Sequence, residues 1–201
     1  MIKNLIYDFG KVLVDYDFDR FYRDLIADDD RRAVFSEYMS DPANIRKMDR
    51  GLKPFEEVIA DLAPGLPGYE KECDDFSRRK PEVVFAEIPG MRELLTRLKA
   101  EGYRLYGLTN WDTQVYVTLN QFDIFKLLDG MVISSEEHVV KPEPEIYHRL
   151  FDKFGLVPEE CIFTDDRPEN IEGGRREGME GIIFASTSQY ETELRTLLRK
   201  Q

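Results

Sequence analysis

The chain has 201 residues, with 28 basic and 40 acidic side chains and a formal net charge of −12 at pH 7. The negative charge argues against a nucleic-acid or anionic-membrane partner, since binding to either needs clustered Lys and Arg. Its length suffices for one domain, or for one domain with an insertion. Cys73 and Cys161 form no CxxC motif and no disulfide framework, and there is no secretory leader or membrane-length apolar run, so we expect a cytoplasmic protein with both thiols in its core.

The first predicted element is a strand, because Leu5-Ile6-Tyr7 is an apolar run typical of a buried strand. The run stops at Asp8, and Gly10 then lets the backbone turn away tightly. Ligands of open α/β sheets bind outside the carboxyl ends of the strands, so Asp8 stands where chemistry is expected. Taken alone, Asp8 could equally begin a turn or cap a helix.

The stretch 17–88 is predicted to contain helices only. Its apolar residues, such as Phe55, Val58, Ile59 and Leu62, recur at helical spacing, and no strand candidate interrupts it. Proline and glycine separate the helix candidates, which are 18–26, 29–39, 42–49, 54–63 and 68–79. We therefore expect an all-helical cap inserted between the first two strands of a sheet.

From residue 89 onward, helix and strand patterns alternate. Strands are predicted at 103–108, 131–133, 161–164 and 181–184. Helices are predicted around Met91–Leu98, at 112–121, from Pro142 in a first turn to Gly155, at 168–177 and at 189–199. This alternation predicts an α/β fold with a parallel sheet covered by helices on both faces. The predicted domains are a core of 1–16 plus 89–201 and a helical cap of 17–88.

Four predicted strands end on polar residues, which are Asp8, Thr109-Asn110, Ser134-Ser135 and Asp165-Asp166, and Lys141 begins the helix after the third. If the strands are parallel neighbours, these groups converge on one crevice. Clustered carboxylates repel one another unless a cation neutralises them, and an oxygen-only cluster suits a hard ion such as Mg²⁺. Lys141 cannot serve the same ion and must face an anion. The set therefore describes phosphoryl transfer through an aspartyl phosphate.

Each of these features also has an ordinary structural explanation. Lys141 could be a solvated helix start, Thr109-Asn110 a helix N-cap, and Asp165-Asp166 a turn ahead of Pro168. All three would have to fall by chance at the same end of the same sheet, which favours the chemical interpretation.

Four segments carry a family resemblance, namely Asp8-Phe9-Gly10-Lys11-Val12-Leu13, Leu108-Thr109-Asn110, Lys141-Pro142 and Asp165-Asp166-Arg167-Pro168-Glu169-Asn170. They resemble the four motifs of the haloacid dehalogenase superfamily, subfamily I, and the resemblance covers the whole chain. It implies a Rossmann-like sheet with a helical cap after the first motif. Within the superfamily, the chain looks most like the bacterial α-D-glucose-1-phosphate phosphatase group and the N-terminal phosphatase domain of epoxide hydrolases.

The resemblance implies a nucleophile and a magnesium site. Asp8 would attack phosphorus with one carboxylate oxygen and bind Mg²⁺ with the other. The backbone carbonyl of Gly10 and the carboxylate of Asp166 would be further ligands, and Asp165 would be a ligand or support one. Asn170 would orient the acidic pair.

The resemblance also implies a binding site for the transferring phosphoryl group. Thr109, Asn110 and Lys141 would hold it. The backbone N–H groups of Phe9 and Gly10 would contribute further donors. The partner is accordingly a small phosphorylated substrate.

Gly10 departs from the usual Asp-x-Asp pattern of these phosphatases, whose second carboxylate protonates the leaving alkoxide and then activates water. The glucose-1-phosphate phosphatase group resembles this Asp-x-Gly form, so activity is still expected, but the acid/base residue is unassigned. General acid/base help is worth ~10²–10⁴-fold, so an anomeric or acyl phosphate suits the site better than a simple alkyl phosphate. Of the nearby acids, Asp15 is expected to support the loop and Asp17 to cap the first cap helix.

Substrate choice is expected to lie in the cap. Arg46, Lys47 and Arg50 belong to a polar turn that could reach over the crevice or be an ordinary charged surface loop. Trp111, directly after Asn110, could line the pocket or serve packing alone.

The sequence thus predicts a magnesium-dependent phosphatase, monomeric or homodimeric, that hydrolyses a small metabolite, in the first place a sugar phosphate. A 2-haloacid dehalogenase also lacks the second acid, but it needs no metal, and the acidic pair Asp165-Asp166 would then be unexplained. A phosphomutase or phosphotransferase, and a catalytically silent phosphate-sensing or binding module, are further alternatives.

Overall fold

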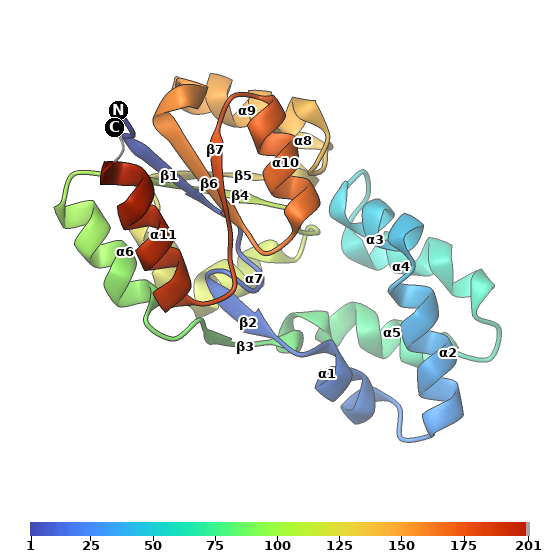
Figure 1. The fold of residues 1–201 in the computed structure, drawn as a ribbon. Coiled ribbons are helices and arrows are strands. Elements are labelled where there is room, and N and C mark those ends of the chain that lie inside the picture. The colour runs from blue at the N-terminus through green and yellow to red at the C-terminus, as the bar shows by residue number, and fades with distance from the viewer. Residues whose placement is uncertain (200–201) are drawn as a thin grey trace.

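The computed structural model describes residues 1–199 (Figure 1). Its centre is a five-stranded parallel sheet in the order β5-β4-β1-β6-β7. The strands are β1 (Asn4–Tyr7), β4 (Arg104–Thr109), β5 (Gly130–Ile133), β6 (Cys161–Asp165) and β7 (Glu180–Ile183). This confirms the predicted parallel α/β fold.

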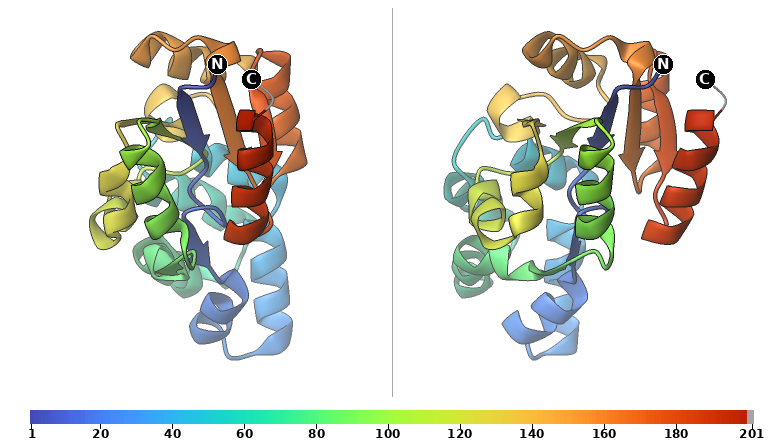
Figure 2. Two further views of the ribbon diagram at one scale, coloured as in Figure 1. Left: turned by 60° about the vertical axis from the view of Figure 1, so that its left-hand side comes forward. Right: turned by 90° about the vertical axis from the view of Figure 1, so that its left-hand side faces the viewer.

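Helices cover both faces of this sheet (Figure 2). One face packs against α6 (Met91–Ala100) and α11 (Thr187–Arg199), and the other against α9 (Pro144–Phe154) and α10 (Pro168–Arg176). Successive strand residues point to opposite faces, so Leu5 and Tyr7 pack with the first pair and Ile6 with the second. Two buried faces explain why the strands are continuous apolar runs.

Five helices lie between β1 and α6 along the chain, and they form one body beyond the carboxyl edge of the sheet (Figure 1). They are α1 (Phe18–Leu25), α2 (Asp29–Met39), α3 (Pro42–Asp49), α4 (Phe55–Leu62) and α5 (Glu70–Arg79). All five were predicted to within two residues. Asp17, Asp28 and Asp41 cap the first three, because each carboxylate accepts a backbone N–H of the first turn. We call residues 17–83 the helical segment.

Aromatic rings form the centre of the helical segment. Phe76 is buried, and its ring contacts those of Phe21, Tyr22, Phe35 and Phe55 at centroid distances of 5.7–6.1 Å. These rings come from α1, α2, α4 and α5, so one cluster joins four of the five helices.

A second, two-stranded sheet joins the helical segment to the rest of the chain. β2 (Val14–Tyr16) enters the segment and β3 (Val84–Glu87) leaves it, and the two pair antiparallel. The prediction that 17–88 contains helices only is therefore wrong at its end. Four residues are too few to show alternation, and β3 gains its strand geometry only by pairing with β2, which lies far away in the sequence.

Other boundaries of the core differ from the prediction. Lys141 and Pro142 lie in a turn and are joined by a cis peptide bond, while Pro144 is the proline in the first turn of α9. α7 (Val115–Gln121) begins three residues late, and a short helix, α8 (Ser134–Glu137), follows β5 directly.

Two expectations from composition can be compared with the structure. Both cysteines are buried and unpaired, as predicted. Among residues 1–199, no helix is both long and apolar enough to cross a lipid bilayer.

Candidate active site

The candidate site lies where the carboxyl edge of the sheet faces the helical segment. Asp8 follows β1, Thr109 ends β4 and Asp165 ends β6, and these three strands are parallel neighbours. A cavity of about 320 Å³ opens above this edge. On the sheet side, it is lined by Asp8, Gly10, Thr109, Asn110, Lys141, Asp166, Arg167 and Asn170.

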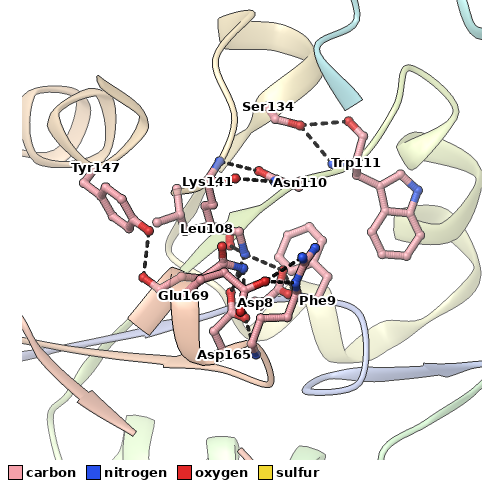
Figure 3. A network of polar contacts seen from close by, with 12 residues as sticks. Asp8, Phe9, Leu108, Asn110, Trp111, Ser134, Lys141, Tyr147, Asp165 and Glu169 are labelled. Carbon is pink, nitrogen blue, oxygen red and sulfur yellow. Dashed lines mark hydrogen bonds and ion pairs between the residues drawn. The ribbon is translucent and has the colours of Figure 1, made fainter. Parts of the chain in front are cut away.

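Lys141 is the buried cation of this edge. Its side-chain Nζ lies 2.9 Å from Asp8 Oδ1 and 2.6 Å from Asp165 Oδ2, and it donates to the Leu108 carbonyl at 2.9 Å (Figure 3). Burial alone would lower the pKa of Lys141, but the two carboxylates outweigh it and raise that pKa. At 4% exposure, Lys141 is not a solvated helix start.

Asn110 fixes the backbone of Lys141. Its side-chain Nδ2 donates to the Lys141 carbonyl at 3.0 Å, and its Oδ1 accepts the Lys141 N–H at 2.8 Å (Figure 3). These bonds occupy the amide that the sequence assigned to the phosphoryl group. The alternative that Thr109-Asn110 caps a helix is wrong, because the residue before α7 is Gln114.

The two acids after β6 have different surroundings. Both oxygens of Asp165 accept hydrogen bonds from Asn170 Nδ2 at 3.0 Å, and Oδ1 also accepts the Arg167 N–H at 2.8 Å. With Lys141 on Oδ2 as well, Asp165 is fully engaged. Asp166 is half-buried and faces the cavity, and burial, followed by the charge of Asp165, raises its pKa.

Asp8 is held in place from several directions. Its N–H donates to the Thr164 carbonyl at 2.9 Å, and its Oδ1 accepts the Phe9 N–H at 2.7 Å. The N–H of Phe9 is thus engaged by the carboxylate in this arrangement and not free for a phosphoryl oxygen. Burial raises the pKa of Asp8 to about 6, although Lys141 opposes the shift.

Two observations show that the residues present fit a cation and an anion. Asp8, Asp165 and Asp166 offer carboxylate oxygens within 4.8 Å of one another, a donor set that suits a hard cation. The buried hydroxyl of Thr109 has no hydrogen-bond partner among residues 1–199. A buried hydroxyl without a partner costs about 1–3 kcal/mol, so this group is suited to a ligand oxygen.

The helical segment supplies the other wall of the cavity, together with Trp111. That wall is largely apolar, with Phe18, Tyr22, Met39, Ile45, Met48, Phe76 and Val83 of the segment and Val84 of β3. Its polar members are Ser40, Asp49, Lys80 and, from the core, Asp112. Lys80 Nζ forms an ion pair with Asp112. Trp111 therefore lies at the cavity, as one of its two predicted roles requires.

The basic residues Arg46, Lys47 and Arg50 do not line this cavity but a separate groove. The guanidinium of Arg50 binds Glu143 and donates to the His138 carbonyl at 3.2 Å, and Arg46 lies 3.6 Å from Glu143. The interpretation of these three as specificity residues is therefore not supported. Arg46 and Arg50 join the helical segment to the core instead, and Lys47 Nζ donates to Asn44 within α3 at 3.4 Å.

Helical spacing explains which residues of α3 face the cavity. Ile45, Met48 and Asp49 are three and four positions apart and share one face, whereas Arg46 and Arg50 share another. The prediction of specificity residues from the sequence was based on charge and did not take this spacing into account. Lys80 and Asp112 carry no comparable local signal, because the fold brings them together across 32 positions.

The residues around the first motif support the loop after Asp8. Asp15 Oδ1 accepts Lys11 Nζ at 2.6 Å and the Tyr16 N–H at 2.9 Å, and Asp17 caps α1, as expected for both acids. Ser134 Oγ accepts the Trp111 N–H at 2.9 Å and donates to the Asp49 carbonyl at 2.6 Å. Ser134 thus joins the end of α3 in the helical segment to Trp111 in the core.

Residues 2–178 match the family model of the haloacid dehalogenase-like hydrolases. The chain belongs to this family.

Several named proteins are similar to this hydrolase. It is 28% identical to flavin mononucleotide hydrolase 1 of Arabidopsis thaliana over 56% of this chain and 46% of that protein. It is 26% identical to a phosphorylated carbohydrates phosphatase of Thermotoga maritima, over 66% and 61%. It thus spans less than two thirds of either. The D-ribitol-5-phosphate phosphatase of Bacteroides thetaiotaomicron is 25% identical over 98% of this chain and 99% of its own.

Solved structures show the same fold. A predicted hydrolase of the family from Porphyromonas gingivalis superposes with a TM-score of 0.77, at 22% identity and full coverage of both chains. A family enzyme from Bacteroides thetaiotaomicron, in complex with magnesium and inorganic phosphate, gives a TM-score of 0.75 at 21% identity, over 93% of this chain and 96% of that one.

The glycine in the first motif of this hydrolase has a neighbour that explains it. A Cβ atom at Gly10 would lie 2.8 Å from Cε1 of Tyr16, so the Tyr16 ring fills the space of a side chain at position 10. Tyr16 also lines the cavity, and burial, with the charges of Asp166 and Asp8, raises the pKa of its hydroxyl to about 12.

Proposed function

We propose that this family member is a magnesium-dependent phosphatase of small phosphorylated metabolites, with Asp8 as the nucleophile. One observation carries the proposal. A buried Lys141 beside the Asp8 carboxylate and the unpartnered hydroxyl of Thr109 face one cavity, together with a second carboxylate, Asp166. Phosphoryl transfer needs this combination of nucleophile, cation site and anion donors.

The metal would bind between Asp8, Asp166 and the backbone carbonyl of Gly10. Asp165 would support this set, because Lys141, Asn170 and the Arg167 N–H engage its oxygens. When bound, Mg²⁺ would neutralise the carboxylates and polarise the phosphoryl oxygens.

In the first step, an oxygen of Asp8 attacks phosphorus as the bond to the leaving group breaks. Lys141 Nζ and the Thr109 hydroxyl stabilise the charge on the equatorial oxygens, and the N–H of Gly10 is a further donor. In the second step, water attacks the phosphorus of the aspartyl phosphate, which releases inorganic phosphate and restores the Asp8 carboxylate. Asn110 contributes by fixing the Lys141 backbone.

The proposed substrate is a sugar or polyol phosphate. A cavity of about 320 Å³ lies at the lower end of the range of ~300–1,000 Å³ for small-molecule sites, which favours a small leaving group. Relatives named as phosphatases of phosphorylated carbohydrates, glyceraldehyde 3-phosphate and ribitol 5-phosphate support the same class.

Phosphate release from p-nitrophenyl phosphate and a panel of sugar phosphates tests the proposal. We expect release with Mg²⁺, none with EDTA and none in the Asp8→Asn variant. Chloride release from 2-chloropropionate in EDTA would indicate a dehalogenase instead. Transfer to a sugar acceptor without free phosphate would indicate a phosphotransferase, and no turnover at all a binding module.

A further inference from the structure

The first motif of this chain lacks an acid/base residue, and the Tyr16 ring occupies the space where its side chain would lie. A group that replaces it must line the cavity and be free to exchange a proton. The carboxylates that line the cavity are Asp8, Asp49, Asp112 and Asp166.

Three of these four carboxylates have other roles. Asp8 is the proposed nucleophile, and Asp166 belongs to the proposed metal site. Asp112 binds Lys80 with Oδ2 and accepts the Gln114 N–H on Oδ1 at 2.8 Å. Within the described part of the chain, no hydrogen bond or ion pair engages the carboxylate of Asp49.

The backbone around Asp49 is anchored to the core, although the residue itself ends α3. The Asp49 carbonyl accepts a hydrogen bond from Ser134 Oγ at 2.6 Å. The next residue, Arg50, binds Glu143, and its carbonyl lies 3.0 Å from His138 Nδ1. α3 and α8 accordingly lie side by side (Figure 1). The half-buried Asp49 is therefore held at a fixed place in the cavity wall.

We propose that Asp49 is the general acid and base that the motif Asp8-Phe9-Gly10 does not provide. The inference rests on the proposed phosphatase function. Protonated Asp49 gives its proton to the leaving-group oxygen as the P–O bond breaks and the bond from Asp8 to phosphorus forms. The Asp49 carboxylate then takes a proton from the water that attacks phosphorus, so the second step releases phosphate and leaves Asp49 protonated again.

The charges around Asp49 suit both steps. Burial is the main cause that raises its pKa to about 7, with Lys80 and Lys141 opposing and Asp112 and Asp8 adding to the shift. A group with a pKa near the working pH can donate and accept a proton in turn. Tyr16, whose hydroxyl pKa is raised to about 12, can donate a proton but is a poor base near pH 7.

The decisive experiment compares leaving groups in the Asp49→Asn variant with Mg²⁺ present. p-Nitrophenolate needs no proton to leave, whereas an alkoxide does. We expect kcat/KM for the best alkyl phosphate of the panel to fall by about 10²–10⁴-fold, and kcat/KM for p-nitrophenyl phosphate to stay within about threefold. For the alkyl phosphate, kcat/KM of the wild type should decline above about pH 7, and this decline should be absent from the pH profile of Asp49→Asn.

Two further variants make the result specific. Asp61→Asn makes the same chemical change at an exposed carboxylate of α4 that pairs with Lys53, and should leave both substrates unaffected. An equal loss for both substrates in Asp49→Asn would overturn the inference, as would a selective alkyl loss in Tyr16→Phe. In each case the phosphatase proposal stands if Asp8→Asn abolishes turnover of p-nitrophenyl phosphate, and fails if it does not.

Discussion

One lysine balances two buried carboxylates at the sheet edge. The side chains of Lys141 and Asp165 are 1% and 0% exposed, so solvent screens their attraction little. Lys141→Met would leave the carboxylates of Asp165 and Asp8 uncompensated. We expect the free energy of unfolding to fall by about 3–5 kcal/mol, measured by urea denaturation in EDTA.

A second variant separates this charge effect from lost packing. Adding Asp165→Asn to Lys141→Met removes one of the two uncompensated charges and should restore part of the lost free energy of unfolding. Lys71→Met breaks the ion pair of an exposed lysine with Asp75 and should lower the free energy of unfolding far less than Lys141→Met does, because solvent screens the exposed pair. A double variant less stable than Lys141→Met would contradict this interpretation.

The raised pKa of Asp49 predicts how stability depends on pH. The folded chain keeps the proton of Asp49 up to about pH 7, whereas the unfolded chain loses it near pH 4. Between these values the native state binds more protons, so this group makes the free energy of unfolding fall as pH rises, and the effect levels off above pH 7. We expect the stability of the wild type relative to Asp49→Asn to decline from pH 4.5 to 7.5 in urea titrations with EDTA. Parallel curves would show that Asp49 ionises normally.

At the scale of elements, the end of α3 is packed tightly against α8. Gly51 has a φ of +59°, and a Cβ there would lie within 2.6 Å of the Ser135 backbone. Gly51→Ala must therefore push the end of α3, including Asp49, away from the core. We expect kcat/KM for alkyl phosphates to fall by about tenfold or more, because small displacements of catalytic groups are costly.

Gly68→Ala is the matched control for this displacement. Gly68 also has a positive φ, +84°, but its Cβ position has open space. In both variants, alanine at a positive φ strains the backbone by about 1–2 kcal/mol. Only in Gly51→Ala does the added Cβ also clash with Ser135. Equal activity of the two variants would show that the position of α3 does not matter for turnover.

Local patterns predicted most elements, and non-local contacts account for the differences. Helical spacing and capping aspartates such as Asp17 are signals that extend over only a few residues, so the sequence predicted the helices of the helical segment. Strand β3 was missed because only its pairing with β2 makes it a strand. The sequence pattern predicted Pro142 in the first turn of α9, but Pro144 occupies that turn, two positions later.

The same division holds for the site. That Asp8, Thr109, Lys141 and the acidic pair Asp165-Asp166 lie together could be predicted, because the strand ends of a parallel sheet share one edge. The sequence could not predict which donors are free to bind a ligand. The Phe9 N–H donates to Asp8, and the Asn110 amide donates to the Lys141 carbonyl. Which side chains of the helical segment line the cavity depends on how that segment packs against the core, and no local sequence pattern predicts this packing.

At the scale of the whole molecule, two separate stretches of chain enclose the cavity. The sheet edge presents mostly charged and polar groups, and the helical segment presents mostly apolar ones. The phosphoryl end of a substrate is therefore expected against the sheet, and its leaving group against the helices. Ser134 and Arg50 join the helical segment to the core, so the distance between the two walls is set by contacts outside the cavity.

The acidic cluster predicts that the whole molecule is stabilised by Mg²⁺. Three carboxylates with oxygens within 4.8 Å repel one another in a chain whose net charge is already −12, and a bound divalent cation removes this repulsion. A ligand at 100 times its Kd stabilises the native state by about 2.7 kcal/mol, which corresponds to roughly 5–10 °C in Tm for a chain of this size. We expect such a rise on adding Mg²⁺ to EDTA-treated protein in a thermal melt.

Asp166→Asn removes a proposed ligand and also part of the repulsion. The variant without metal should therefore melt no lower than the wild type without metal, and it should need at least about tenfold more Mg²⁺ for half of its rise. NaCl at matched ionic strength is the control for screening. An equal rise in NaCl, or an unchanged Mg²⁺ requirement in Asp166→Asn, would show that the cation does not bind at this edge of the sheet.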